Sequence, residues 1–102
     1  MITTDEIQAK VNSVIRQSEY KNLIKKVSLF GSYLSNNAKE DSDVDLLIEF
    51  MPEVSVGFFK YFDIQADFET HLKKKVDLLT PEGISPYLRD GIIKSAKVIY
   101  ER

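Results

Sequence analysis

The sequence predicts a small α/β domain, because helical and strand patterns alternate along its 102 residues. Apolar residues recur at helical spacing near the N-terminus and again in the middle of the chain. Short apolar runs of strand length lie between and after these segments. The length fits one domain of ordinary size, so we expect residues 1–102 to form a single domain with one modest core.

The composition excludes several classes of protein. The chain is 43% hydrophobic and 29% charged, which is typical of a folded globular protein, and its formal net charge is −2. This charge gives no reason to expect direct binding to nucleic acid. There are no cysteines, which excludes disulfides and thiolate sites and fits the cytoplasm. No apolar run approaches the roughly 20 residues of a membrane span, and the N-terminus lacks the features of a signal peptide.

The first two predicted elements are a helix and a short strand. The helix covers residues 4 to about 18, with Thr4 as its cap and acidic residues in its first turn. Its apolar positions follow a helical stripe that we assign to the core: Ile7, Val11, Val14 and Ile15. The strand that follows covers about Val27 to Phe30.

A turn and a second strand come next. Gly31-Ser32 follows the first strand, and Ser32 to Asn37 is expected to form a short helix that ends at Asn36-Asn37, since asparagine tolerates the left-handed conformation. After a polar connection, the stretch from Asp43 to Phe50 is predicted to be a buried strand that opens with two carboxylates.

The second half of the chain is predicted to hold two helices and two strands. A long helix begins at Ser55 or Gly57 and ends near Leu72, and its aromatic residues Phe58, Phe59 and Phe62 are expected to lie in the core because of their helical spacing. The remaining elements are a strand over Val76–Leu79, a helix from Ser85 or Pro86 to about Ser95, and a final strand over Lys97–Glu101.

Asp43 and Asp45 form a candidate metal site. Side chains at i and i+2 of a strand share a face, so these carboxylates would project together about 6–7 Å apart. Such a pair suits Mg²⁺, which takes one or two carboxylates together with phosphate oxygens. Gly31 would let the backbone approach a phosphate, and the Ser32 N–H would favour an anion. Taken alone, the acidic cluster fits equally well a solvated turn before a strand.

Two other motifs are excluded. A calcium loop that began at Asp41 would need glycine at the position of Leu46 and glutamate at the position of Pro52. The Gly-Ser turn does not belong to a P-loop, because no Gly-Lys-Ser/Thr follows at the required spacing.

Asp77 lies inside the short apolar strand Val76–Leu79, where an unpaired buried charge would be costly. Three explanations are open: the residue faces water on an edge strand, it pairs with a lysine, or it joins Asp43 and Asp45 on a neighbouring strand. In the third case the three carboxylates would form a two-metal phosphoryl-transfer site.

Together these residues resemble a known family. Gly31-Ser32, ten residues, Asp43-x-Asp45 and then Asp77 in a third strand are similar to the minimal nucleotidyltransferases of the DNA polymerase beta superfamily. The ending, from Tyr87 to Glu101, also looks like that family. One departure concerns the arginine and glycine that often follow the Gly-Ser turn in the family. Ser35-Asn36 stands there in this chain.

The resemblance implies a fold and a reaction. The fold is α/β (α+β), a small mixed β-sheet with helices packed against one face. The reaction transfers AMP from ATP to an acceptor hydroxyl. By the resemblance, Asp43, Asp45 and Asp77 are the catalytic and metal-binding residues for two Mg²⁺ ions, and Gly31 and Ser32 hold the β- and γ-phosphates.

Small members of the family are similar to antitoxins that place AMP on a tyrosine of a HEPN-domain RNase toxin. The resemblance therefore implies that the chain is a protein adenylyltransferase in a toxin-antitoxin system. Two alternatives remain: a binding module that masks the toxin without catalysis, and a nucleotidyltransferase that acts on a small molecule.

Overall fold

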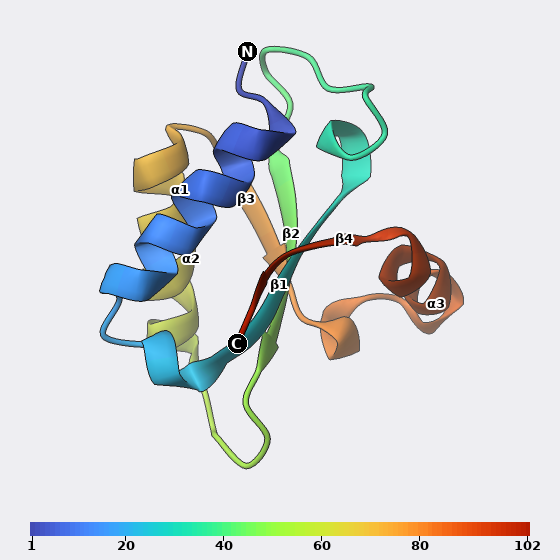
Figure 1. Ribbon diagram of the computed structural model, residues 1–102. Helices are drawn as coiled ribbons and strands as arrows, with labels where there is room; N and C mark the ends of the chain where they lie inside the picture. Colours follow the sequence, from blue (N-terminus) through green and yellow to red (C-terminus); the bar gives the residue numbers. More distant parts are fainter.

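A computed structural model describes residues 1–102, which form one four-stranded mixed sheet with three α-helices (Figure 1). The strand order is β3-β2-β1-β4, where β1 is antiparallel to β2 and β4, and β2 is parallel to β3. This confirms the mixed α/β class. The strands are β1 (Ile24–Phe30), β2 (Val44–Phe50), β3 (Val76–Leu79) and β4 (Lys97–Glu101). The helices are α1 (Thr4–Gln17), α2 (Phe58–Leu72) and α3 (Pro86–Ser95), with 3₁₀ turns η1 (Lys21–Leu23), η2 (Gly31–Tyr33) and η3 (Pro81–Gly83).

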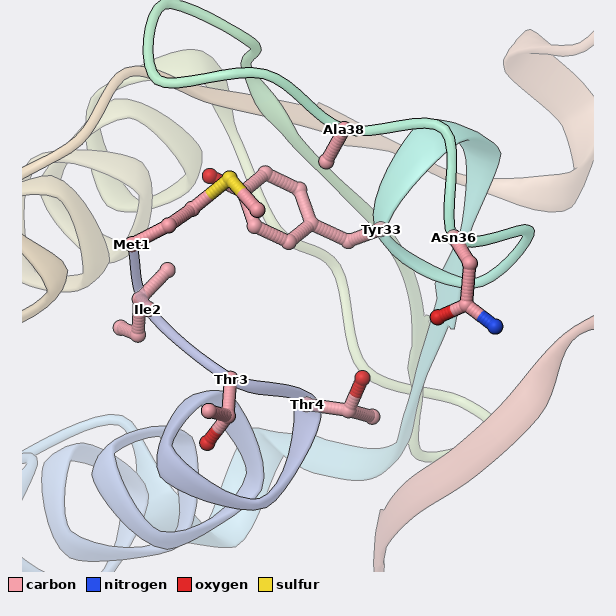
Figure 2. Close-up of a pocket in the computed structure, with 7 residues that line it drawn as sticks. All are labelled: Met1, Ile2, Thr3, Thr4, Tyr33, Asn36 and Ala38. Atoms are coloured by element: carbon pink, nitrogen blue, oxygen red, sulfur yellow. The ribbon is translucent and has the colours of Figure 1, made fainter.

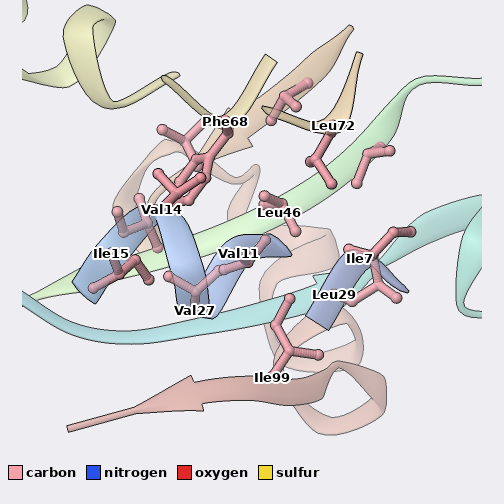
Figure 3. Packing of buried hydrophobic residues seen from close by; sticks show 14 of the residues in the cluster. Ile7, Val11, Val14, Ile15, Val27, Leu29, Leu46, Phe68, Leu72 and Ile99 are labelled. Carbon is pink, nitrogen blue, oxygen red and sulfur yellow. The ribbon is translucent and has the colours of Figure 1, made fainter. Parts of the chain in front are cut away.

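One face of the sheet is closed by α1 and α2, which lie side by side against it (Figure 1). Strand β2 alternates with a period of two, so Val44, Leu46 and Ile48 all point to this face and are fully buried. They meet the apolar stripes of both helices in the main core (Figure 3). The predicted stripe of α1 is confirmed, since Ile7, Val11, Val14 and Ile15 are all buried.

The opposite face of the sheet is covered only in part. A smaller cluster of Phe30, Leu47 and Ile84 lies there, packed against Leu79 of β3, Ile92 of α3 and Ala96. Figure 1 shows α3 on the side of the sheet away from α1 and α2. The expected packing of helices against one face therefore holds for α1 and α2, whereas α3 and η3 cover part of the second face.

The boundaries of two elements differ from the prediction. The cap of α1 is Thr3 instead of Thr4, because Thr3 forms a capping box in which its hydroxyl accepts from the Glu6 N–H and Glu6 reaches back to the Thr3 N–H. Strand β1 begins at Ile24 instead of Val27, since its ladder to β2 already starts with the pair Ile24 and Phe50.

The prediction that the aromatic residues at the start of α2 belong to the core was wrong. Phe58, Phe59 and Phe62 are 79%, 90% and 56% exposed. The buried stripe of α2 consists instead of Ile64, Phe68 and Leu72, which lie on its later turns. In these first turns Tyr61 makes the contact with the strands, at the carbonyl of Leu78 and the ring of Phe50, so helical spacing alone does not bury its aromatic neighbours.

None of the helices combines the length and the apolar character that crossing a membrane would require.

Candidate active site

The register of the sheet brings the predicted carboxylates together. Asp45 on β2 lies directly opposite Asp77 on β3, and on its other side it lies opposite Phe30, the last residue of β1. Asp43 immediately precedes β2, so the predicted second strand begins at Val44 and the first carboxylate stands just outside it. Asp43 and Asp77 are exposed, and Asp45 is half-buried. Of the three explanations for Asp77, the structure combines two: it is on an edge strand, and it is a neighbour of Asp45.

Gly31 makes room for Asp45. Its φ of +78° lies in the left-handed region that disfavours side chains, and a Cβ at this position would fall 2.0 Å from Oδ2 of Asp45. From the sequence, we predicted that this glycine lets the backbone approach a phosphate. In the structure its first role is internal, since only a residue without a side chain lets the carboxylate of Asp45 lie over the turn.

The surroundings of Asp45 disfavour the charged form of its carboxyl group. Its pKa is raised, first by partial burial and then by the negative charges of Asp77 and Asp43, while the backbone N–H of Ser32 lowers it in part. The negative charges of Asp77 and Asp43 thus act on the carboxyl group of Asp45, and the Ser32 backbone supplies a compensating dipole. A cation at this place would relieve the repulsion.

The turn after Gly31 is closed by its own side chains. The Ser35 hydroxyl donates to the carbonyls of Gly31 and Ser32, at 3.3 and 3.4 Å. Asn36 ends the turn with a φ of 61°, which confirms the expected left-handed stop. The regular helical part is shorter than predicted and covers Gly31–Tyr33. Ser35 stands where the resemblance leads one to expect an arginine, and its hydroxyl turns back onto the backbone.

A ladder of polar side chains on α2 fixes the strand that carries Asp77. Tyr61 donates to the carbonyl of Leu78, Gln65 donates to the carbonyl of Val76 at 2.8 Å, and Glu69 accepts from the N–H of Val76 at 3.0 Å. These contacts satisfy backbone groups at the outer edge of β3, which would otherwise be free. Sequence reasoning missed this ladder. Its only signal is the i, i+4, i+8 spacing of three polar residues beside an apolar stripe.

The donor set fits a hard divalent cation, because it consists of carboxylate oxygens. No three acidic, histidine or cysteine side chains are gathered closely enough to form a ready-made metal site. Asp43 and Asp77 are exposed, so their side chains are free to turn toward Asp45. Asp43, Asp45 and Asp77 are therefore the residues that would hold Mg²⁺, with Asp45 as the fixed member.

A separate hollow lies between the N-terminus and the η2 segment (Figure 2). Residues Met1 to Thr4 line one side, and Tyr33, Asn36 and Ala38 line the other. Tyr33 is buried and its hydroxyl has no hydrogen-bond partner. No carboxylate lines this hollow, and it is distinct from the cluster around Asp45.

The mixed sheet aligns the Gly-Ser turn with the carboxylates of the next two strands, as the resemblance to the nucleotidyltransferases implies. The sequence matches the model of the Polymerase beta, Nucleotidyltransferase family over residues 10–102, and the chain belongs to this family.

Two relatives are similar over nearly their whole length. Protein adenylyltransferase MntA of Thermococcus cleftensis is 30% identical over 102 residues, which cover 98% of this chain and 97% of the relative. A candidate protein adenylyltransferase of Methanocaldococcus jannaschii, MJ0435, is 36% identical over 92 residues, which cover 90% of this chain and 92% of the relative.

Solved structures show the same fold. A minimal nucleotidyltransferase superposes with a TM-score of 0.75 at 25% identity, over 93% of this chain and 94% of that one. A toxin-antitoxin complex with AMP-PNP matches with a TM-score of 0.73 at 18% identity, over 93% of this chain and 73% of that one. A complex of a tri-AMPylated Shewanella oneidensis HEPN toxin with its MNT antitoxin matches with a TM-score of 0.64 at 18% identity, over 94% of this chain and 73% of that one.

Proposed function

We propose that this protein transfers AMP from ATP to a tyrosine hydroxyl of a HEPN-type toxin and thereby acts as its antitoxin. The observation that carries the proposal is the pairing of Asp45 with Asp77 beside the Gly31 turn. Family membership supports the class of reaction. The choice of a protein acceptor is supported by the relatives, which are named protein adenylyltransferases, and by a neighbour in complex with an AMPylated HEPN toxin.

The reaction requires the acceptor oxygen to attack the α-phosphorus of ATP. A new O–P bond forms, the bond from that phosphorus to the oxygen that bridges to the β-phosphate breaks, and pyrophosphate leaves with the electron pair. The acceptor proton passes to the carboxylate of Asp77, which is exposed on the edge strand and able to meet an incoming hydroxyl.

The other residues bind and orient. The backbone of Gly31 and Ser32 would receive the β- and γ-phosphates. Asp43 and Asp45 would hold the cations, and Asp77 would complete one of the two metal sites. Mg²⁺, when bound, neutralises the charge of the triphosphate and of the leaving group. Most of the rate is expected from positioning and charge neutralisation instead of covalent chemistry by the protein.

The test uses the purified partner, which is expected to be a neighbour-encoded HEPN protein. We expect its intact mass to rise by one AMP or a multiple when this chain, ATP and Mg²⁺ are added, and the modified residue to map to a tyrosine. An unchanged partner mass with suppressed RNase activity would show that the chain neutralises its partner by masking. Modification of a small molecule instead would identify the third candidate function.

A further inference from the structure

A cavity of about 350 Å³ lies at the C-terminal end of β3, between the start of α2 and the η3 turn. Its walls are mostly apolar and aromatic. Val56, Gly57, Phe58 and Tyr61 line it from the helix side, and Leu79 and Thr80 line it from the end of β3. No residue in its lining is charged, so the cavity does not suit a phosphate. Its size is at the lower end of the range for small-ligand pockets.

This cavity adjoins the candidate active site through β3. Leu79 follows Asp77 by two residues, so the two side chains stand on the same face of the strand. Tyr61, which lines the cavity from α2, is also linked to the site. Its hydroxyl donates to the carbonyl of Leu78. The pKa of Tyr61 is raised by burial and by the negative charge of Asp77. The aromatic wall of the cavity is therefore within electrostatic reach of the carboxylate that would take the acceptor proton.

The order of the strands gives the site a direction. Gly31 and Ser32 follow β1, Asp45 is on β2, Asp77 is on β3, and the cavity lies at the end of β3, two residues beyond Asp77. Phosphoryl transfer places the attacking and leaving oxygens roughly in line with the phosphorus between them. If pyrophosphate departs toward the Gly31 turn, the acceptor must approach from the β3 side, where the cavity lies.

We propose that this cavity holds the aromatic ring of the acceptor side chain and presents its phenol oxygen to Asp77. This inference rests on the proposed function and names the acceptor subsite within it. A neutral ring would pack on Phe58 and Tyr61, where offset or edge contacts between rings are favourable. The exposed rings of Phe58 and Phe62 are stacked, with their centroids 6.2 Å apart. They extend the apolar surface outside the cavity, where residues that flank the acceptor tyrosine would lie.

Two glycines give a matched pair of variants. A Cβ at Gly57, in the cavity wall, meets no atom within 4 Å, and the same holds for Gly91 on α3. Neither has a positive φ. Gly57→Leu therefore places a side chain at the cavity without a backbone clash, and Gly91→Leu makes the same change outside it. Phe58→Ala removes the ring that forms one wall of the cavity. Because Phe58 is mostly exposed, this change also leaves the core intact.

The experiment measures AMP transfer to the purified partner as a function of partner concentration, together with the affinity for Mg·ATP. We expect Gly57→Leu to lower kcat/KM for the partner by at least about tenfold, a cost typical of misfit in an apolar pocket. We expect Phe58→Ala to raise KM for the partner. Affinity for Mg·ATP should stay within about twofold in both variants, and Gly91→Leu should match the wild type.

Three outcomes would overturn the inference. If folded Gly57→Leu and Phe58→Ala transfer AMP at the wild-type rate, the cavity does not hold the acceptor. If both variants lose affinity for Mg·ATP as much as they lose transfer, the cavity holds the adenine ring instead. If the wild-type chain itself transfers no AMP to the partner, the proposed function fails, and the acceptor subsite fails with it. The first two outcomes leave the proposed function standing.

Discussion

The two faces of the sheet are built from the same strands but differ in what covers them. On β2, Leu46 points into the main core and is fully buried, whereas Asp45 beside it points to the opposite face and is half-buried. On β3, Val76 and Leu78 are buried, and Asp77 between them is exposed. The face under α1 and α2 provides most of the buried packing and therefore the stability. The opposite face, which we call the open face, is packed only in part and presents carboxylates at the surface.

The comparison teaches that the stable face holds the reactive one in register. Asp45 and Asp77 are opposite each other because their neighbours on the same strands are locked into the core. Substitutions on the closed face should therefore change the free energy of unfolding, and substitutions on the open face should change the rate of transfer. The four predictions that follow test this separation.

The largest effect is expected from Leu46→Ala on the closed face. Deleting a fully buried leucine side chain should lower the free energy of unfolding by about 2–5 kcal/mol, since it leaves a cavity in the core. Thermal unfolding measures the loss. Leu88→Ala is the matched control, because Leu88 is mostly exposed and should change the melting temperature little. Equal losses in the two variants would contradict the assignment of the core.

Asp77→Asn should have the next largest effect and should act on the rate alone. We expect AMP transfer to fall at least about 10²-fold, because the group that takes the acceptor proton is lost, while Mg·ATP still binds through Asp43, Asp45 and the Gly31 turn. Rapid-mixing or single-turnover assays separate the two steps. Asp67→Asn, an exposed carboxylate on α2, is the control. Wild-type turnover in Asp77→Asn would leave Asp77 with a purely structural role.

The ladder of polar side chains on α2 should affect both stability and transfer rate, each to a smaller extent. Gln65→Leu leaves the carbonyl of Val76 without its donor, which should cost about 1 kcal/mol in the free energy of unfolding. It should also lower the transfer rate, since Asp77 follows Val76 directly. Gln17→Leu, at an exposed position on α1, is the control. A stability loss with kcat and KM unchanged would show that the ladder only closes the strand edge.

The smallest effect concerns Asp45 and pH. Its pKa is raised in the folded state, so folding favours the protonated carboxyl. When a chelator keeps the site free of metal, the stability that Asp45 contributes is fully present below its pKa in the unfolded state, about 3.9. This stability is lost as the pH rises through the higher pKa of the folded state. Asp45→Asn should therefore melt slightly higher than the wild type at neutral pH and show less of this decline. Melting curves on both sides of that pKa test the sign, with Asp41→Asn as the control.

Much of the site could be predicted because its residues lie in short, regular segments. The spacing of Asp43 and Asp45 and the position of Asp77 within an apolar strand are local patterns, and the strand over Val76–Leu79 was predicted with the bounds that the structure has. The pairing of Asp45 with Asp77 depends on strand order, which a local pattern does not contain, so from the residues alone it remained one of three explanations.

The misses have the same physical origin. The ladder of Tyr61, Gln65 and Glu69 has meaning only once β3 is known to be an edge strand. Phe58 and its aromatic neighbours have the spacing of a core stripe, but burial depends on what lies opposite, and the first turns of α2 meet the strands through Tyr61 instead. The sequence specifies the period of a helix well, but it does not specify which side of each turn meets the sheet.

The most direct test of the open face as the nucleotide site is the melting temperature with and without Mg·ATP. A ligand that binds only the folded state raises this temperature. We predict a clear rise for the wild type and for a control double variant, Asp41→Asn with Asp67→Asn, which removes the same charge from exposed positions. We predict no rise for Asp43→Asn with Asp45→Asn. A full Mg·ATP-dependent rise in that second double variant would show that these carboxylates are not the metal and nucleotide site.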